Sequence, residues 1–349
     1  MSGPRFVLVC GSGGVGKTTT AAAIGTNAAR AGERVLVITV DPAKRLAQAL
    51  GVDADGSSTV TETEGGGSLT VQMLDTKAGW DSLIRRHARD EATAARVLRN
   101  PLYDNITSRF VNSHDYIAME QVNELSDSAD YDLVVVDTPP SRNALALLDA
   151  PRRMREFFGG RVIQWLTLPY RNKFLSLASK PFLLVADRLL GAQFLGDVAE
   201  FFSLLQSMES GFVERAGRVE RLLASDRVAC TVVTTAESAS VTEAIQLAQA
   251  LRSRGMTLSQ VVVNRVVTVG SPGETMPSPE EIGTRVPGID AVAAHTAVSE
   301  MRARHVATSD RHAAGVARVR SVFPDVRTVH FAPGRESALQ AIGAAVAAP

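Results

Sequence analysis

Short apolar runs rich in β-branched residues recur along the chain, and most are followed by a stretch with helical periodicity. Because these runs are apolar almost throughout, they are typical of parallel strands buried on both faces. Strands are predicted at Arg5–Cys10, Arg34–Thr39, Leu69–Leu74, Leu133–Val136, Val228–Thr234, Val261–Asn264 and Arg327–Phe331. The alternation of strands and helices predicts an α/β fold with a doubly wound, mostly parallel sheet.

The segments between the predicted strands divide into helices and loops. An alanine-rich helix is expected over Lys17–Arg30, and Gly32 just beyond it is a typical helix stop signal. The small side chains of this helix suit close packing on a sheet. Two stretches rich in glycine or proline, Asp53–Ser68 and Gly270–Gly288, are predicted to be loops.

Residues 151–225 form a long segment that is helical in pattern and that a minimal sheet does not need. We interpret residues 1–349 as a single domain with a helical subdomain inserted at 151–225. Such a segment forms either the packed core of a subdomain or a hydrophobic groove for a partner. Its apolar residues recur at helical spacing, at Val198, Phe201, Phe202, Leu205 and Met208 and again at Phe212, Ala216, Val219 and Leu223.

The composition narrows the classes of function. The chain has 37 basic and 37 acidic residues with no long block of one sign, which argues against a general nucleic-acid-binding surface. Cys10 and Cys230 are the only cysteines and the histidines are scattered, so neither zinc nor an iron–sulfur cluster has obvious ligands. The few cysteines, and the lack of an apolar run of about 18 residues, predict a soluble protein of the reducing cytoplasm.

A glycine-rich loop joins the first predicted strand to the first predicted helix, with the sequence Gly11-Ser12-Gly13-Gly14-Val15-Gly16-Lys17-Thr18. In this context the backbone amides can point at a β-phosphate at the helix N-terminus. Lys17 would reach the β- and γ-phosphate oxygens, and the Thr18 hydroxyl would ligate Mg²⁺. We therefore predict a P-loop NTPase. Its predicted nucleotide contacts in this loop are Gly11, Gly13, Gly14, Val15, Gly16, Lys17, Thr18 and Thr19.

Two aspartates follow apolar strands and complete the predicted active site. Asp41 is placed to orient or deprotonate an attacking water, although an aspartate before proline can equally open a turn and cap a helix. Asp137 ends the strand at Leu133–Val136 in a Walker B arrangement, where it would hold Mg²⁺ directly or through a water. The predicted catalytic residues are Lys17, Asp41 and Asp137, and the predicted metal ligands are Thr18 and Asp137.

These motifs give the chain a family resemblance. It resembles the arsenite-pump and tail-anchored-protein-targeting ATPases, which are dimeric P-loop ATPases with a deviant Walker A motif. The resemblance rests on Gly11 to Thr19, on Asp41-Pro42-Ala43 as a first switch, and on Asp137 to Leu145 as a second. It implies that Asn264 recognises adenine and that Pro333 and Gly334 form a loop against the base. The implied cofactors are ATP and Mg²⁺, and the implied activity is hydrolysis of ATP to ADP and phosphate in a nucleotide-driven dimer switch.

The sequence departs from this family in ways that concern its partners. Ser12 stands where the family has a lysine that reaches the phosphates of the other subunit. A homodimer would therefore lack that cation, which favours a heterodimer with a lysine-bearing homologue, or a weakly hydrolysing regulatory subunit. Two cysteines cannot form the family's intersubunit zinc site or bind arsenite as the pumps do. The single phosphate loop also requires a second chain, and the dimer would act on a membrane protein or a hydrophobic client.

Overall fold

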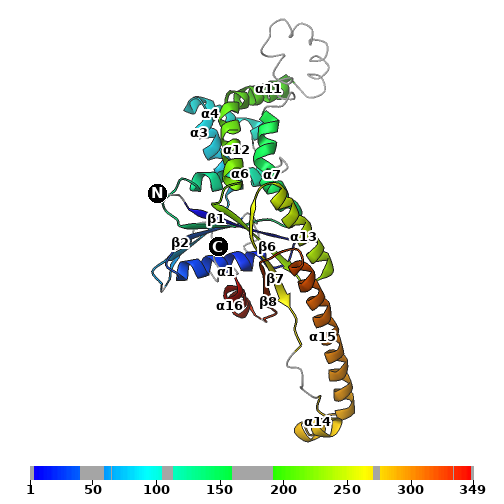
Figure 1. The fold of residues 1–349 in the computed structure, drawn as a ribbon. Coiled ribbons are helices and arrows are strands. Elements are labelled where there is room, and N and C mark those ends of the chain that lie inside the picture. The colour runs from blue at the N-terminus through cyan, green and yellow to red at the C-terminus, as the bar shows by residue number, and fades with distance from the viewer. Residues whose placement is uncertain are drawn as a thin grey trace.

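The computed structural model describes residues 4–39, 59–63, 65–103, 113–158, 192–269, 276–332 and 334–346. At its centre lies an eight-stranded sheet with the order β3-β4-β2-β5-β1-β6-β7-β8 (Figure 1). Neighbouring strands run parallel, except that β3 and β4 are antiparallel. The strands are β1 (Arg5–Gly11), β2 (Arg34–Thr39), β3 (Thr59–Glu62), β4 (Ser68–Met73), β5 (Leu133–Asp137), β6 (Val228–Thr235), β7 (Thr257–Val266) and β8 (Val326–His330).

The sheet confirms the predicted fold class, and each predicted strand is present with ends shifted by at most a few residues. Successive residues of β1 enter opposite cores. Phe6 and Leu8 belong to one apolar cluster, and Val7 and Val9 belong to the other. Burial on both faces explains why the strand sequences lack a regular polar alternation.

Two segments predicted to be loops contain regular structure, so those predictions were wrong in part. The short edge strand β3 lies within Asp53–Ser68, and its polar sequence gives no apolar run that would reveal it. Helix α14 (Pro279–Arg285) lies within Gly270–Gly288. Ser278 and Glu281 form a capping box around its start, and Pro279 occupies the first turn, where proline favours a helix instead of breaking it.

Helices cover both faces of the sheet. α1 (Lys17–Arg30) and α16 (Arg335–Ala345) pack on one face, while α7 (Ser141–Phe158) and α13 (Ser238–Ser253) pack on the other. The bounds of α1 are those predicted. A Cβ added to Gly25 of α1 would lie only 2.5 Å from Cγ2 of Val37. This close approach explains why the helix is built from small residues.

A layer of helices rises above the face that carries α7 (Figure 1). It draws on helices that precede β5 as well as on helices that follow it, and its core contains large aromatic side chains such as Trp80, Tyr116 and Phe212. The division into one domain with a subdomain at 151–225 stays a prediction. The helices are α3 (Thr76–His87), α4 (Glu91–Arg99), α6 (Ser113–Leu125), α7, α11 (Ala192–Ser207) and α12 (Glu209–Leu223).

The apolar stripes predicted in α11 and α12 are buried where the structure describes their side chains. Phe201 and Phe212 are at most 1% exposed, and Phe202 is half-buried. The described part of these stripes is therefore packed core instead of an open groove. The side chain of Val198 lies outside the described part of the chain. The fully buried members are Phe201, Leu205, Met208, Phe212, Ala216, Val219 and Leu223.

A helical arm, α14 and the 30-residue helix α15 (Ala291–Arg320), projects away from the sheet (Figure 1). His312 fixes its base, because Nδ1 accepts a hydrogen bond from the Val267 N–H at 3.0 Å and Nε2 lies 3.0 Å from Glu237 Oε1. Farther along, Val292 and Met301 are 66% and 64% exposed. The sequence did not predict this arm, because its apolar residues do not gather in one helical stripe.

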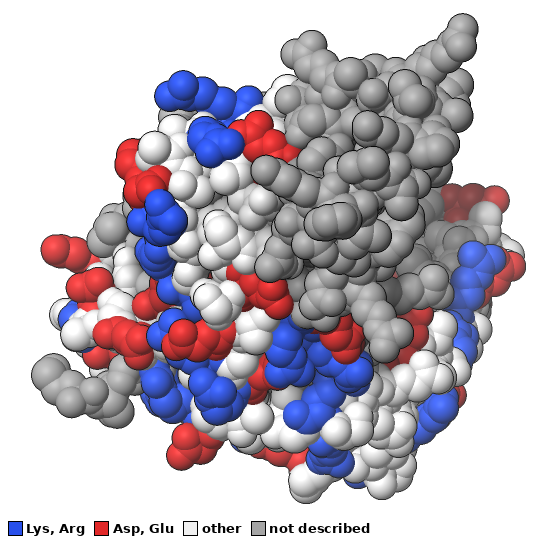
Figure 2. Space-filling model, turned by 90° about the horizontal axis from the view of Figure 1, so that it is seen from above, with Lys and Arg blue, Asp and Glu red and all other residues white. Residues whose placement is uncertain are grey.

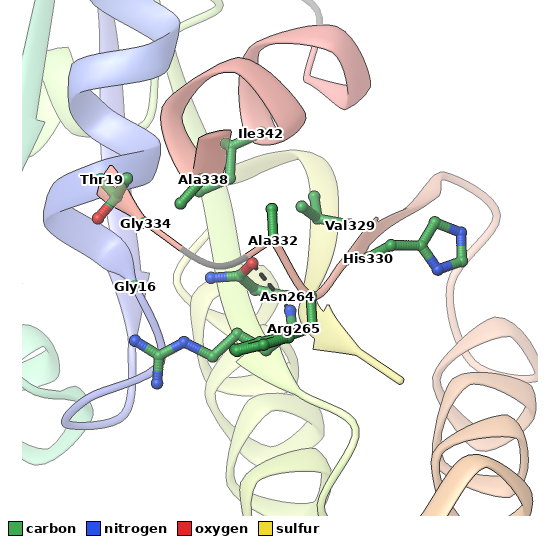
Figure 3. Close-up of a pocket in the computed structure, with 11 residues that line it drawn as sticks. Gly16, Thr19, Asn264, Arg265, Val329, His330, Ala332, Gly334, Ala338 and Ile342 are labelled. Atoms are coloured by element: carbon green, nitrogen blue, oxygen red, sulfur yellow. Dashed lines mark hydrogen bonds between the residues drawn. The ribbon is translucent and has the colours of Figure 1, made fainter. Parts of the chain in front are cut away.

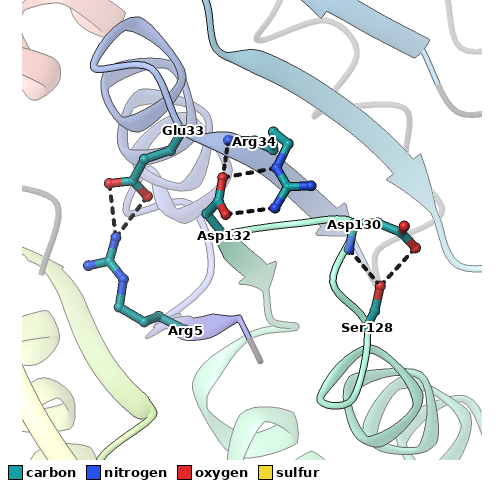
Figure 4. A network of polar contacts seen from close by, with 6 residues as sticks. All are labelled: Arg5, Glu33, Arg34, Ser128, Asp130 and Asp132. Atoms are coloured by element: carbon teal, nitrogen blue, oxygen red, sulfur yellow. Dashed lines mark hydrogen bonds and ion pairs between the residues drawn. The ribbon is translucent and has the colours of Figure 1, made fainter. Parts of the chain in front are cut away.

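Ion pairs connect segments at the amino-terminal edge of the sheet (Figure 4). The Arg34 guanidinium donates to both carboxylate oxygens of Asp132, at 3.1 and 2.8 Å. These hydrogen bonds hold the pKa of Asp132 below its usual range. Arg5 Nη2 lies 2.7 Å from Glu33 Oε2. The opposite edge, where the parallel strands end, carries the candidate site.

On the face seen in Figure 2, neither acidic nor basic side chains form a large patch over the described part of the surface. Blue and red side chains are interspersed over its described part, as expected from a formal net charge of zero. None of the described helices combines the length and the hydropathy that crossing a bilayer requires.

Candidate functional site

The loop between β1 and α1 curls around an open cleft of about 500 Å³. Gly11 and Gly16 have φ angles of 154° and 102°, which side chains rarely allow. A Cβ on Gly11 would lie 2.1 Å from the Val233 carbonyl oxygen, whereas a Cβ on Gly13 or Gly14 would meet nothing within 4 Å. The amino-terminal end of α1, where backbone amides have no carbonyl partner within the helix, thus borders a space that an anion can enter.

Thr18 and Asp137 face each other in this cleft. The strand register places Val9 of β1 and Thr39 of β2 opposite Asp137. Thr18 Oγ1 donates to Asp137 Oδ2 at 2.8 Å, and Thr39 Oγ1 donates to the same oxygen at 3.3 Å. Asp137 is 2% exposed. Hydroxyl and carboxylate oxygens are the hard donors that Mg²⁺ prefers, so these residues fit a magnesium ion.

Lys17 and Ser12 meet at the tip of the loop. Lys17 Nζ donates to the Ser12 carbonyl oxygen at 2.8 Å, and the lysine is 8% exposed. The Ser12 hydroxyl donates to the carboxylate of Glu243 on α13. Position 12 therefore presents a hydroxyl next to a carboxylate, and it brings no positive charge to the loop.

A second pocket, of about 260 Å³, opens beside the cleft (Figure 3). Asn264 of β7 lines it, and its Nδ2 donates to the Val15 carbonyl oxygen at 2.9 Å. Gly334, with a φ of 91°, lines the pocket from the start of α16. Thr19 and Gly16 complete the contact with the phosphate loop. The structure thus brings Asn264 and Gly334 to the loop, and their role in binding adenine stays a prediction.

Several residues that line this pocket were not predicted from the sequence. Arg265 lines both the pocket and the cleft. His330 and Phe331 also line the pocket, and Phe331 is 60% exposed. Arg265 follows Asn264 directly, but neighbouring residues of a regular strand point to opposite faces, so the sequence alone does not place both side chains in one pocket.

Parts of the predicted site lie outside the described residues. These parts are Pro333 and the first switch, Asp41-Pro42-Ala43, so the role of Asp41 remains a prediction. The start of the second switch is described. Thr138 Oγ1 donates to the Val9 carbonyl oxygen at 2.8 Å, and α7 begins at Ser141. This bond anchors the second switch to β1 directly after Asp137.

The two cysteines lie beside the loop but have the character of packing groups. Both are buried, on β1 and β6. The hydrogen bond with Cys10, together with burial, raises the pKa of the Cys230 thiol well above its usual value. The Cys230 thiol therefore stays neutral, and a buried neutral thiol is a poor ligand. Among the residues with described positions, no group of three or more His, Cys, Asp or Glu is arranged to hold a metal ion.

Comparison with known proteins places this site within a family. The family model of the anion-transporting ATPases matches residues 4–274. The chain belongs to this family. It is 26% identical to ATPase ASNA1 homolog 1 of Paramecium tetraurelia over 271 residues, which cover 75% of each protein. It is 30% identical to the uncharacterized protein SCO2128 of Streptomyces coelicolor, over 78% of this chain and 65% of that protein. It is 25% identical to ATPase GET3 of Candida dubliniensis, over 75% and 73% respectively.

Membership in the anion-transporting ATPase family confirms the resemblance seen in the sequence. The protein is an ATPase, and its membership in this family implies the use of ATP. The matched residues contain the phosphate loop, Asp137 and Asn264. They end before α14, so the arm and the Gly334 side of the second pocket lie beyond the matched region.

Proposed function

We propose that this ATPase hydrolyses ATP to ADP and phosphate with Mg²⁺ bound at Thr18 and Asp137. The observation that carries the proposal is the 2.8 Å contact between the Thr18 hydroxyl and the buried Asp137 carboxylate, at the mouth of the glycine loop. When bound, Mg²⁺ would neutralise charge on the β- and γ-phosphates. Lys17 lies at the same cleft, and it would exchange the Ser12 carbonyl for phosphate oxygens.

The proposed reaction is an in-line displacement. Asp41 orients a water and accepts its proton as the water oxygen bonds to the γ-phosphorus. The bond from that phosphorus to the β–γ bridging oxygen breaks, and ADP leaves with the electron pair. Amides of the glycine loop and Lys17 stabilise the charge that develops on the phosphoryl group.

The proposed biological output is a dimer switch that energises or regulates a partner, either a membrane protein or a hydrophobic client. The cleft is open on the side of Gly13 and Gly14, where a second subunit has room to approach a bound nucleotide. The described apolar stripes of α11 and α12 are buried, so a client surface would have to form elsewhere or after a rearrangement.

The second candidate is a weakly hydrolysing regulatory subunit of a heterodimer with a lysine-bearing homologue. The observation that favours it is the contact of Ser12 with Glu243. A second copy of this chain would bring another serine and another carboxylate to the interface. A lysine from a homologue would instead bring a cation to both the phosphates and Glu243.

Turnover measurements on the isolated chain and on its complex test both candidates. The chain is purified from its native host, any co-purifying protein is identified, and ATP turnover is measured with and without that protein. Asp41→Asn should still bind ATP but lose hydrolysis by roughly two orders of magnitude, the typical cost of losing a general base. Asp310→Asn, an exposed change on the arm, is the matched control. Normal turnover by Asp41→Asn would refute the role of that residue, and a robust rate from the isolated chain would refute the need for a partner.

A further inference from the structure

We propose that Arg265 is a catalytic residue of this site, whose guanidinium binds the triphosphate from the base side. This inference rests on the proposed hydrolysis of ATP at the glycine loop. It assigns to Arg265 the positive charge that position 12 does not provide. No feature of the sequence motif singles this residue out, but its position, its backbone conformation and its charge do.

The position of Arg265 joins the two cavities of the site. Among the described residues, Gly16, Thr19 and Arg265 line both of them, and Arg265 is the charged one of these three. A nucleotide whose base occupies the smaller pocket and whose phosphates occupy the cleft must pass this junction. Figure 3 shows the Arg265 side chain directed from β7 towards the phosphate loop near Gly16.

The backbone at Arg265 is irregular in a way that re-aims the side chain. Val263 pairs with Thr328 and Val266 pairs with His330, so β7 has one more residue than β8 over this interval. Neighbouring residues of a regular strand point to opposite faces, yet here Asn264 and Arg265 line the same pocket. Bulges of this kind commonly redirect a side chain beside an active site.

The bulge also places Arg265 in an unfavourable conformation. Its φ is 58°, and among the described residues it is the only non-glycine with a positive φ. Side chains disfavour this region, so such a conformation persists only where the surroundings enforce it. Asn264 contributes to this, because its Oδ1 accepts a hydrogen bond from the Arg265 N–H at 2.9 Å.

The guanidinium of Arg265 does not stabilise the described part of the protein through polar contacts. It is exposed and makes no hydrogen bond or ion pair with any described residue. Several other arginines have a carboxylate partner, as in the pairs Arg34–Asp132 and Arg254–Asp149. A strained backbone that holds an unpaired cation at a cleft is consistent with an anionic ligand.

The charges of the residues that line the cleft also favour an anionic ligand. Among the described residues of its lining, Lys17 and Asp137 are the other charged ones, and their formal charges cancel. Arg265 therefore makes the described part of the lining positive overall. A planar guanidinium can donate two parallel hydrogen bonds to phosphate oxygens. As the bond to the γ-phosphorus breaks, negative charge grows on the departing ADP, and Arg265 would stabilise it from the base side.

The test compares two ligands with the same base and sugar, of which only one carries phosphates. Calorimetry gives the dissociation constants of ATP and adenosine for wild type, Arg265→Asn and Arg265→Lys, and turnover is measured in parallel. Asparagine tolerates positive φ better than most side chains, so this variant removes the charge with little change in backbone preference. Arg320→Asn, which changes an exposed arginine at the carboxyl-terminal end of α15, is the control.

We expect Arg265→Asn to weaken ATP binding by about 10- to 100-fold, the effect of losing charge-assisted hydrogen bonds, and to leave adenosine binding unchanged. Arg265→Lys should recover part of the loss, and turnover should follow the same order. Equal weakening of ATP and adenosine would assign Arg265 a structural role and overturn the proposal, as would unchanged ATP binding. If Arg265→Asn fails to fold, Arg265→Gly relieves the positive φ and gives the same comparison. A wild-type protein that binds no ATP would instead refute the proposed function.

Discussion

Gly16→Ala tests how the phosphate loop and the base pocket are coupled. Gly16 has a φ of 102°, and a Cβ there would lie 2.3 Å from Nδ2 of Asn264. Two costs follow. The left-handed backbone costs an alanine about 1–2 kcal/mol. Displacing the Asn264 amide from the Val15 carbonyl, 2.9 Å away, costs about 1 kcal/mol more. We expect the free energy of unfolding to fall by about 2–3 kcal/mol.

Gly14→Ala and Gly13→Ala separate these two costs. Gly14 has a φ of 75° but open space at its Cβ, so its substitution should cost only the backbone term, about 1 kcal/mol. Gly13 has open space without a positive φ, and its substitution should be close to neutral for stability. All three changes reduce the entropy of the unfolded chain equally, so the differences report on the native loop.

The assay is urea denaturation followed by circular dichroism, combined with a double-mutant cycle. With Asn264→Ala in the background, the clash at Gly16 disappears, and Gly16→Ala should cost about 1 kcal/mol less than it does alone. The reasoning would be refuted if Gly16→Ala cost no more than Gly14→Ala. It would be refuted equally if the effects of Gly16→Ala and Asn264→Ala were additive.

Two predictions concern the helical layer. Arg215 and Glu120 form an ion pair with both side chains at most 9% exposed, so Glu120→Gln should leave the buried cation with only the half-buried Glu124, 3.6 Å away, and cost about 3 kcal/mol in urea denaturation. The control Glu156→Gln breaks an exposed pair with Arg152 and should cost less than about 1 kcal/mol, and equal effects would contradict the argument. Burial raises the pKa of Asp115 from 3.8 to about 6, so its ionisation opposes folding as the pH rises through this interval. Asp115→Asn should match wild type near pH 3.5 and be more stable by about 1–3 kcal/mol at pH 7, and parallel pH profiles of unfolding would disprove this.

The central part of the fold follows from the sequence because it depends on local patterns. Continuous apolar runs reveal the parallel strands, and the glycine loop fixes where Lys17 and Thr18 lie. The remaining features depend on tertiary pairing. β3 exists only through its antiparallel pairing with β4, and α15 is anchored by contacts such as that of His312 with Val267. The side chain of Arg265 points into the site because β7 has a bulge opposite β8. No pattern of residues in the sequence predicts this bulge.

Calorimetric titration of the folded chain with ATP, in the presence and absence of Mg²⁺, tests the central claim most directly. We predict Mg²⁺-dependent binding in wild type and in the surface control Lys77→Ala, whose side chain is 67% exposed. We predict loss of binding in Lys17→Ala, with an unchanged circular dichroism spectrum. Binding of ATP that persists in Lys17→Ala, or its absence from well-folded wild-type protein, would contradict the assignment of the glycine loop as the nucleotide site.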